Sequence, residues 1–243
     1  MNHEVQPAEP AVSALPKRRW YQCSLKGMLV AMMLVGLPFA WLAYERIEVQ
    51  KREVAIAAIK HLGGIVDLDE AQEFRPKWLL SMLGGKSVGE VVRVDFQGTE
   101  VTDADLEHLA GFMKLKALLL EGTQVTDAGL AHLARLKQLE ILHLSETAVT
   151  SAGLAHIAGL RALRELSLSS NQVTDAGLVH LAGLESLHVL DLGGTQVTDT
   201  GLRHLTGLKQ LSVLKVKGSK VTDQGLSRLQ KALPNIGTRR KAE

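Results

Sequence analysis

The chain has 243 residues, a length that suits one or two domains. Hydrophobic residues make up 46% and charged residues 22%, which is a globular composition and excludes a wholly disordered protein. The formal net charge of +2 is too small to indicate nucleic-acid binding, so we expect no nucleic-acid partner. The single cysteine, Cys23, excludes an internal disulfide and a metal site built from paired cysteines.

An apolar segment near the N-terminus predicts a membrane anchor. Residues 27–44 contain no charge, and as a helix they would span roughly 27 Å, close to the hydrocarbon thickness of about 30 Å. We expect an N-terminal tail over 1–24 and one transmembrane helix over 25–44 in contact with the lipid bilayer. Two alternatives are a cleaved signal peptide, for which the sequence offers no good cleavage site, and a helix buried in a soluble core.

The orientation of this anchor follows from the positive charges beside it. Four lysines and arginines precede the uncharged segment 27–44 and four follow it by residue 60, but Lys17, Arg18 and Arg19 form the tighter cluster. Because cytoplasmic flanks carry the excess of positive charge, we expect a cytoplasmic N-terminus. The single-pass protein would then hold its C-terminal part outside the cytoplasm.

Two sequence patterns recur with a period of 24 residues. The string VT(D/S)xxL starts at six evenly spaced valines: Val101, Val125, Val149, Val173, Val197 and Val221. A second pattern, LxxLxLxx(T/N/S), precedes each of them, as in Leu139-Leu142-Leu144-Thr147. Six copies at a fixed period in this range indicate a solenoid in which stacking buries the leucines that no single repeat could bury.

These residues resemble leucine-rich repeats of the 24-residue class, in which LxxLxLxGTxVTDAGLxHLAGL recurs. The whole chain is similar to bacterial single-pass membrane proteins that carry such repeats, strongly over 91–236 and more loosely over 17–90. The resemblance implies a short α/β leucine-rich-repeat solenoid of six repeats. Its parallel strands would line the concave face and its helices the convex face.

The residue pattern supports the same local structures. The last two leucines of LxxLxL are two apart and point to one side of a strand. Threonines such as Thr102 suit helix N-caps, and the aspartates that follow, such as Asp103, suit the first helical turn. We expect the glycines at 111, 159, 183 and 207 to end the helices.

The segments that flank the repeats predict caps. Residues 45–90 should form a juxtamembrane helix that stops at Gly63-Gly64, a strand near 65–68 and a short helix near 76–80. Together they would cover the first repeat. After the repeat domain over 91–236, the basic C-terminal tail over 237–243 should fray.

Recognition residues should lie where the repeats differ. Two positions of the repeat face outward and vary: the residue between the last two leucines of LxxLxL and the residue two positions after it. The side chains at these positions are mostly polar or small, and none is aromatic. The candidate partner-binding residues are Asp95, Leu119, Glu121, His143, Asp191, Lys215, Lys217 and Lys220.

No catalytic or metal-binding motif stands out. His143, Asp191 and Ser167 share one face, but no oxyanion hole or pocket accompanies them. Five histidines recur every 24 residues from His108 to His204, and we call them the histidine column. We expect them on the convex side and interpret them as structural residues and not as metal ligands. We expect no enzyme activity, no cofactor and no bound metal.

The expected function is recognition of an unknown protein partner on the concave face, or scaffolding. One alternative is an adaptor in ubiquitin-type protein turnover, because the repeats also resemble those of F-box proteins, although no F-box is visible. Another is a self-associating structural protein, because residues 65–107 carry a net charge of −6 and residues 209–243 one of +7. Such opposite ends would allow weak head-to-tail contact.

Overall fold

A computed structural model describes residues 25–69 and 89–239, without the side chains of residues 25–32, 34–36 and 38. The chain forms two compact units, Met1–Tyr44 and Glu45–Glu243. In the first unit the described residues belong to helix α1 (Leu25–His61), which continues into the second unit. Among the residues described, no helix is long and apolar enough to cross a membrane. The tail expected over 1–24 and the short helix expected near 76–80 lie outside the described residues.

The second unit starts with the end of helix α1, a turn and strand β1. Helix α1 gives way to a turn at Gly63, whose φ of +82° favours glycine. Strand β1 (Ile65–Asp69) follows and pairs antiparallel with β2 (Glu90–Asp95). Ile59 of α1 is fully buried in the core that the repeats share. The helix, its stop and the strand near 65–68 are therefore confirmed.

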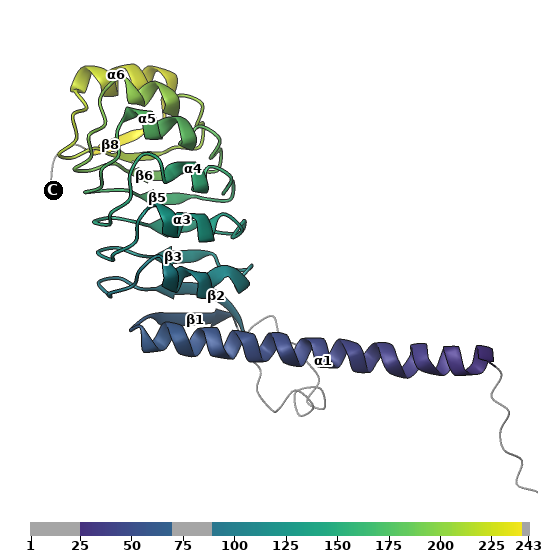
Figure 1. Ribbon diagram of the computed structural model, residues 1–243. Helices are drawn as coiled ribbons and strands as arrows, with labels where there is room; N and C mark the ends of the chain where they lie inside the picture. Colours follow the sequence, from purple (N-terminus) through teal and green to yellow (C-terminus); the bar gives the residue numbers. More distant parts are fainter. Residues whose placement is uncertain (1–24, 70–88, 240–243) are drawn as a thin grey trace, which may run out of the picture. The chain divides into compact units, whose positions relative to one another are not determined.

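Strands β2 to β8 form a parallel ladder in chain order (Figure 1). After β2 they are β3 Ala117–Leu119, β4 Ile141–His143, β5 Glu165–Ser167, β6 Val189–Asp191, β7 Val213–Lys215 and β8 Gly237–Arg239. Each strand pairs with the next at a sequence offset of one repeat, as Leu118 does with Leu142. The α/β solenoid with parallel strands is therefore confirmed.

The return segment of each repeat holds a short helix. The helices are η1 Ala104–Gly111, α3 Asp127–Leu133, α4 Leu154–Ile157, α5 Asp175–Leu178, η2 Val179–Leu181, η3 Gly201–Leu205 and α6 Asp223–Ala232. Three of them are 3₁₀ helices, in which residues three apart lie on one side. This geometry suits the paired leucines of the repeat, such as Leu106 and Leu109, both fully buried.

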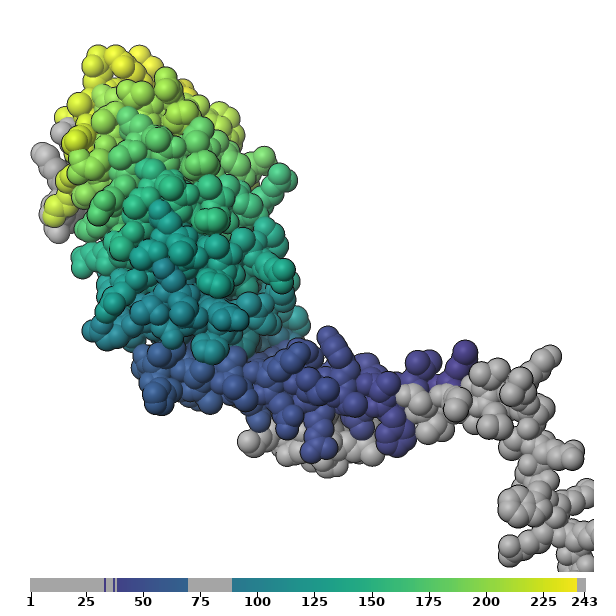
Figure 2. Space-filling model, in the orientation of Figure 1, coloured from purple at the N-terminus to yellow at the C-terminus, as the bar shows by residue number. Residues whose placement is uncertain are grey.

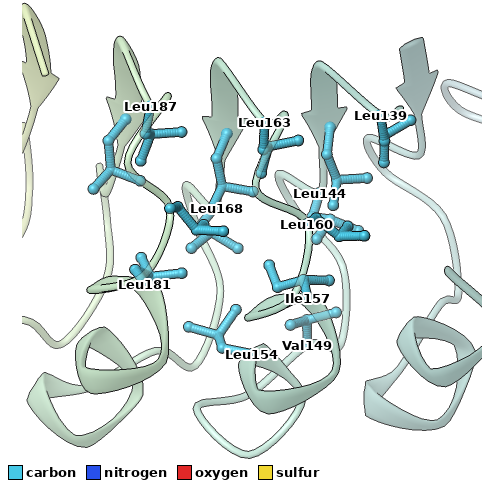
Figure 3. Packing of buried hydrophobic residues seen from close by; sticks show 14 of the residues in the cluster. Leu139, Leu144, Val149, Leu154, Ile157, Leu160, Leu163, Leu168, Leu181 and Leu187 are labelled. Atoms are coloured by element: carbon cyan, nitrogen blue, oxygen red, sulfur yellow. The ribbon is translucent and has the colours of Figure 1, made fainter. Parts of the chain in front are cut away.

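The core is a layer of leucines between the strands and the helices. Figure 3 shows Leu144 and Leu168 pointing from the strand side toward Leu154 and Ile157 on the helix side. Leu144 and Leu168 are both 0% exposed, as the inward assignment of the strand leucines predicts. Adjacent repeats share this layer, so the coils form one continuous stack (Figure 2).

The left-handed residues of the repeats lie in the turn after each strand and not at the ends of the helices. In all six repeats one residue of this turn has φ between 56° and 75°, namely Gly98, Gly122, Glu146, Ser170, Gly194 and Gly218. The glycines at 111, 159, 183 and 207 have no positive φ. They end the helices or follow within two residues of the last helical residue, as expected, and they do so without a left-handed conformation.

The Val-Thr-Asp segments join neighbouring repeats. The carboxylate of Asp103 accepts hydrogen bonds from the backbone N–H of Thr126 (2.7 Å) and from its hydroxyl (2.6 Å) in the next repeat. The same pair of bonds links Asp127 to Thr150. We call this row the Thr–Asp edge, and its links are Asp103–Thr126, Asp127–Thr150, Ser151–Thr174, Asp175–Thr198 and Asp199–Thr222. The aspartates thus bind the following repeat as well as beginning a helix, a role that the N-cap interpretation missed.

The glycine three residues after the threonine of each Val-Thr-Asp or Val-Thr-Ser segment after the first makes room for the link from the preceding repeat. A Cβ atom on Gly153 would lie 2.2 Å from Oδ1 of Asp127, and one on Gly129 would lie 2.4 Å from Oδ1 of Asp103. Any side chain there would displace the carboxylate from its threonine. Glycine is therefore needed at this position because a side chain would not fit, and not because the backbone adopts a conformation that favours glycine.

The first repeat departs from this arrangement at Asp105, which stands where the later repeats have glycine. Its Oδ2 accepts the backbone N–H of Thr102 (2.9 Å) and the hydroxyl of the same threonine (2.7 Å). These bonds, together with the nearby His108, lower the pKa of the Asp105 carboxyl below its ordinary value. Asp105 thus supplies from within the first repeat the acceptor that later threonines receive from the preceding repeat.

The C-terminal end extends the ladder beyond the expected repeats. Residues Gly237–Arg239 form β8, which pairs parallel with β7. The expectation that 237–243 fray is therefore wrong for 237–239, because Val216 donates its N–H to the carbonyl of Arg239 at 3.0 Å. Residues 240–243 lie outside the described part of the chain.

Candidate recognition surface

The exposed side of the strand ladder carries three rows of side chains, which we call the strand face. The central row follows the register of the strands and consists of Asp95, Leu119, His143, Ser167, Asp191, Lys215 and Arg239. Two residues after the end of each strand, in the turn that follows, the outer row consists of Gln97, Glu121, Ser145, Ser169, Gly193 and Lys217. Ser145 is the one buried member of this row. Two residues before the central row, the inner row consists of Arg93, Ala117, Ile141, Glu165, Val189 and Val213.

Most of the candidate residues lie together on this face. Asp95, Leu119, His143, Asp191 and Lys215 occupy the central row as the spacing predicts. The next two candidates, Glu121 and Lys217, follow them in the outer row. Their involvement in binding stays a prediction.

Lys220 is the exception among the candidates. It follows the left-handed turn at Gly218, and its backbone N–H donates to the carbonyl of Val197 at 3.0 Å. The turn carries Lys220 away from the hollow that Lys215 and Lys217 line. Of the three candidate lysines, only Lys215 and Lys217 therefore line the same hollow.

Sequence reasoning missed the inner row. Ala117 is buried, and Ile141, Val189 and Val213 are half-buried, so this row is mainly apolar. The strand face is therefore less polar than the two rows considered from the sequence suggested. The strand alternation in the sequence could have predicted this row, because the alternation that places Leu119 on the strand face also places Ala117 there.

Charged side chains on the strand face pair with one another. Nε2 of His143 lies 3.0 Å from Oε1 of Glu165, and Nζ of Lys215 lies 3.5 Å from Oδ2 of Asp191. Arg93 and Asp95 form a third pair at 3.1 Å. These side chains are between about a fifth and a half exposed, so each pair contributes little to stability.

The geometry gives no support to a catalytic triad. The hydroxyl of Ser167 is 2.6 Å from that of Ser145, while His143 contacts Glu165. Asp191 accepts the backbone N–H of Gly193 at 2.9 Å. Each of the three side chains that share the face thus has a partner outside the hypothetical triad.

The described residues also contain no group of three or more side chains placed to hold a metal ion. In the histidine column, His108 and His156 are exposed, and His132, His180 and His204 are half-buried. The structural role expected for the column stays a prediction.

A hollow of about 890 Å³ lies at the C-terminal end of the strand face. We call it the C-terminal hollow. Its lining includes the cations Lys215, Lys217 and Arg239 and the carboxylates Asp191 and Asp223, with small residues such as Gly193 between them. A side chain at Gly193 would come within 3.2 Å of the carbonyl oxygen of Lys217, so glycine keeps this space open. Arg239 was missed from the sequence because residues 237–239 were assigned to a frayed tail.

Comparison with known families accounts for the middle of the chain. A family of leucine-rich repeats matches residues 113–173, and a family described as two copies of leucine-rich repeats matches residues 161–205. The chain carries leucine-rich repeats. Such repeats typically mediate protein–protein interactions and are usually non-catalytic, and neither match is to an enzyme family. No curated protein matches the chain.

Several solved structures resemble the chain. Internalin C2 from Listeria monocytogenes is 25% identical with a TM-score of 0.47, over 68% of this chain and 73% of that one. An internalin, inlF, of the same organism is 20% identical with a TM-score of 0.45, and the match covers 66% of this chain but only 53% of inlF. The leucine-rich-repeat ectodomain of the receptor kinase SOBIR1 from Arabidopsis thaliana is 17% identical with a TM-score of 0.47, over 71% and 96%. All three TM-scores lie below 0.5, so we draw nothing further from these likenesses.

Proposed function

We propose that this protein is a non-catalytic recognition module that binds a protein partner along the strand face. The observation that carries the proposal is the contrast between repeated and varied positions. The leucines and threonines that recur in the repeats, and the aspartates found at the same position in all repeats but the one with Ser151, are used within the scaffold. The three rows of the strand face, in contrast, differ from repeat to repeat. Since the fold does not need those varied side chains, they are available to a partner.

The proposed mechanism is surface complementarity. The apolar residues Ile141, Val189 and Val213 supply area that a partner can bury, and paired charges such as His143–Glu165 border it. The strand face has no tryptophan or tyrosine, and such residues usually dominate tight interfaces. We therefore propose weak or transient binding.

We also propose that residues 25–44 tether the module to a membrane, with the N-terminus in the cytoplasm and the repeats outside it. The proposal rests on the uncharged sequence over 27–44 and on its position within the uninterrupted helix α1. The full-length chain should then stay with membranes after alkaline carbonate washing, and added protease should reach the repeats only from the extracytoplasmic side. Release of the chain by the wash, or an N-terminus near residue 41, would contradict the anchor.

Site-specific crosslinking tests the binding proposal. The photoreactive residue p-benzoylphenylalanine is placed at Leu119 on the strand face or, as a matched control, at the exposed Ala131 in α3 of the same repeat. In the full-length chain in its native membrane, the first position should give discrete adducts with another protein and the second should not. Equal adduct patterns from both positions, or none from either, would contradict recognition by the strand face.

A further inference from the structure

The C-terminal hollow concentrates positive charge that the described residues do not neutralise. Lys215 is paired with Asp191, and the other lining carboxylate, Asp223, has an interaction of its own. Among the described residues, no carboxylate forms an ion pair with Lys217 or Arg239, and both are exposed. Two cations at one end of an open hollow favour an anionic occupant.

The surroundings of these cations distinguish between kinds of anion. Val213 begins β7, and Val189 is its register partner on β6; both lie on the strand face beside the residues that line the hollow. A free inorganic ion would use only the cations, whereas a polypeptide could use both the cations and the valines. The hollow is open to solvent, a shape that suits an extended chain better than a small enclosed ligand.

We infer that the C-terminal hollow binds an extended acidic segment of the protein partner, with a carboxylate between Lys217 and Arg239 and an apolar side chain on Val189 and Val213. This inference rests on the proposed function and names the chemistry of the partner. Arginine binds a carboxylate through two parallel hydrogen bonds, and the lysine adds a compact charge beside it.

The strand fixes the spacing within such a segment. Val213 lies in β7 and Lys217 in the turn that follows it, four residues later, which is at most about 13 Å of extended chain. Lys217 lines the same hollow as Lys215 of β7. An extended segment running along β7 therefore needs its apolar and acidic residues four apart. A separation of three would turn one of the two side chains away from the surface.

Synthetic peptides provide the test. A fluorescein-labelled ten-residue peptide of serine and threonine carries one valine and, four residues away, a single glutamate. Two control peptides have a valine-to-glutamate spacing of three, or glutamine in place of the glutamate. Fluorescence anisotropy with the full-length chain at low salt should show the first peptide binding about tenfold more tightly than either control.

Protein variants place the binding in the hollow. Lys217→Gln combined with Arg239→Gln should weaken binding of the first peptide about tenfold and reduce its salt dependence. Arg228→Gln combined with Lys231→Gln removes the same charge from exposed positions on α6 outside the hollow and should change binding less than about twofold. Both double variants should melt like the wild type, because none of the four side chains is buried.

The outcomes separate this inference from the proposed function. Equal weakening by the two double variants would indicate general charge attraction and overturn the inference, as would equal binding of the three peptides. Binding of inorganic phosphate at the hollow without the acidic peptide would also overturn it. If strand-face crosslinks from Leu119 persist while no peptide binds, protein recognition stands and only the acidic segment is refuted.

Discussion

The Thr–Asp edge and the strand face belong to the same repeats but use their polar groups in opposite ways. At the edge, both carboxylate oxygens of Asp127 accept hydrogen bonds from Thr150, and the same pair of bonds recurs at the other aspartates of the row. On the strand face, the central row includes Leu119, His143 and Lys215. No single structural role explains side chains as different as these. Repetition within one chain thus separates the residues that hold the coils together from those left for a partner.

The largest expected effect comes from the core beneath the strand face. Leu144→Ala or Leu168→Ala should lower the free energy of unfolding by about 2–5 kcal/mol, because each removes a fully buried side chain from a layer shared by several repeats. Urea denaturation followed by circular dichroism measures the loss. His143→Ala, one residue before Leu144 but on the exposed side, should cost less than about 1 kcal/mol. Equal losses would mean that the inward and outward assignments are reversed.

The next effect tests the space that the Thr–Asp edge requires. Gly153→Ala should cost about 2–3 kcal/mol, because its methyl group would displace Asp127 from Thr150. Gly207→Ala is the matched control, since a Cβ atom there meets nothing within 4 Å, and it should be neutral or slightly stabilising. Similar melting of the two variants would show that the link between repeats carries no stability.

A gain of stability at the Thr–Asp edge should also be measurable. The third repeat has Ser151 in place of aspartate, and its hydroxyl accepts the N–H of Thr174 at 2.9 Å. Ser151→Asp should raise the free energy of unfolding by about 1 kcal/mol, because a carboxylate accepts the same bonds with its full charge. A thermal melt at neutral pH measures the gain. Destabilisation would contradict the account of the edge.

The smallest effect concerns the first repeat and appears only in acid. The pKa of the Asp105 carboxyl is lowered in the folded chain, so its contribution to stability is complete above the ordinary carboxyl pKa near 4 and disappears as the pH falls through the lower folded value. Asp105→Asn should therefore make stability less dependent on pH below about 5. Unfolding by urea from pH 6 to pH 2.5 measures this, with Glu107→Gln as the charge control. An unchanged acid limb would rule out the Asp105–Thr102 bonds as its source.

The sequence was sufficient for much of the fold. The 24-residue period predicted the parallel ladder, and the alternation within LxxLxL correctly placed Leu144 and Leu168 inside. Interactions between repeats were harder to predict. The pairing of Asp127 with Thr150 depends on a distance across the stack, which spacing along the chain does not reveal.

The candidate surface shows the same limit. The central row followed from alternation, but the inner row was missed because the prediction started at the second leucine of the pattern and not before it. Arg239 was missed because β8 has no leucine to mark it; its strand forms by extending the existing ladder. Lys220 was grouped with Lys215 and Lys217 because a left-handed turn at Gly218 is not visible as a change of direction in the sequence.

One measurement tests most directly the claim that the strand face is not needed for folding. A quadruple variant, Leu119→Ser, Glu121→Gln, Lys215→Gln and Lys217→Gln, changes four strand-face positions and no side chain of the Thr–Asp edge or the leucine layer. Its free energy of unfolding in urea should stay within about 1.5 kcal/mol of the wild type, with an unchanged slope. A loss as large as that of Leu144→Ala would show that these side chains hold the fold together, and would contradict their assignment to recognition.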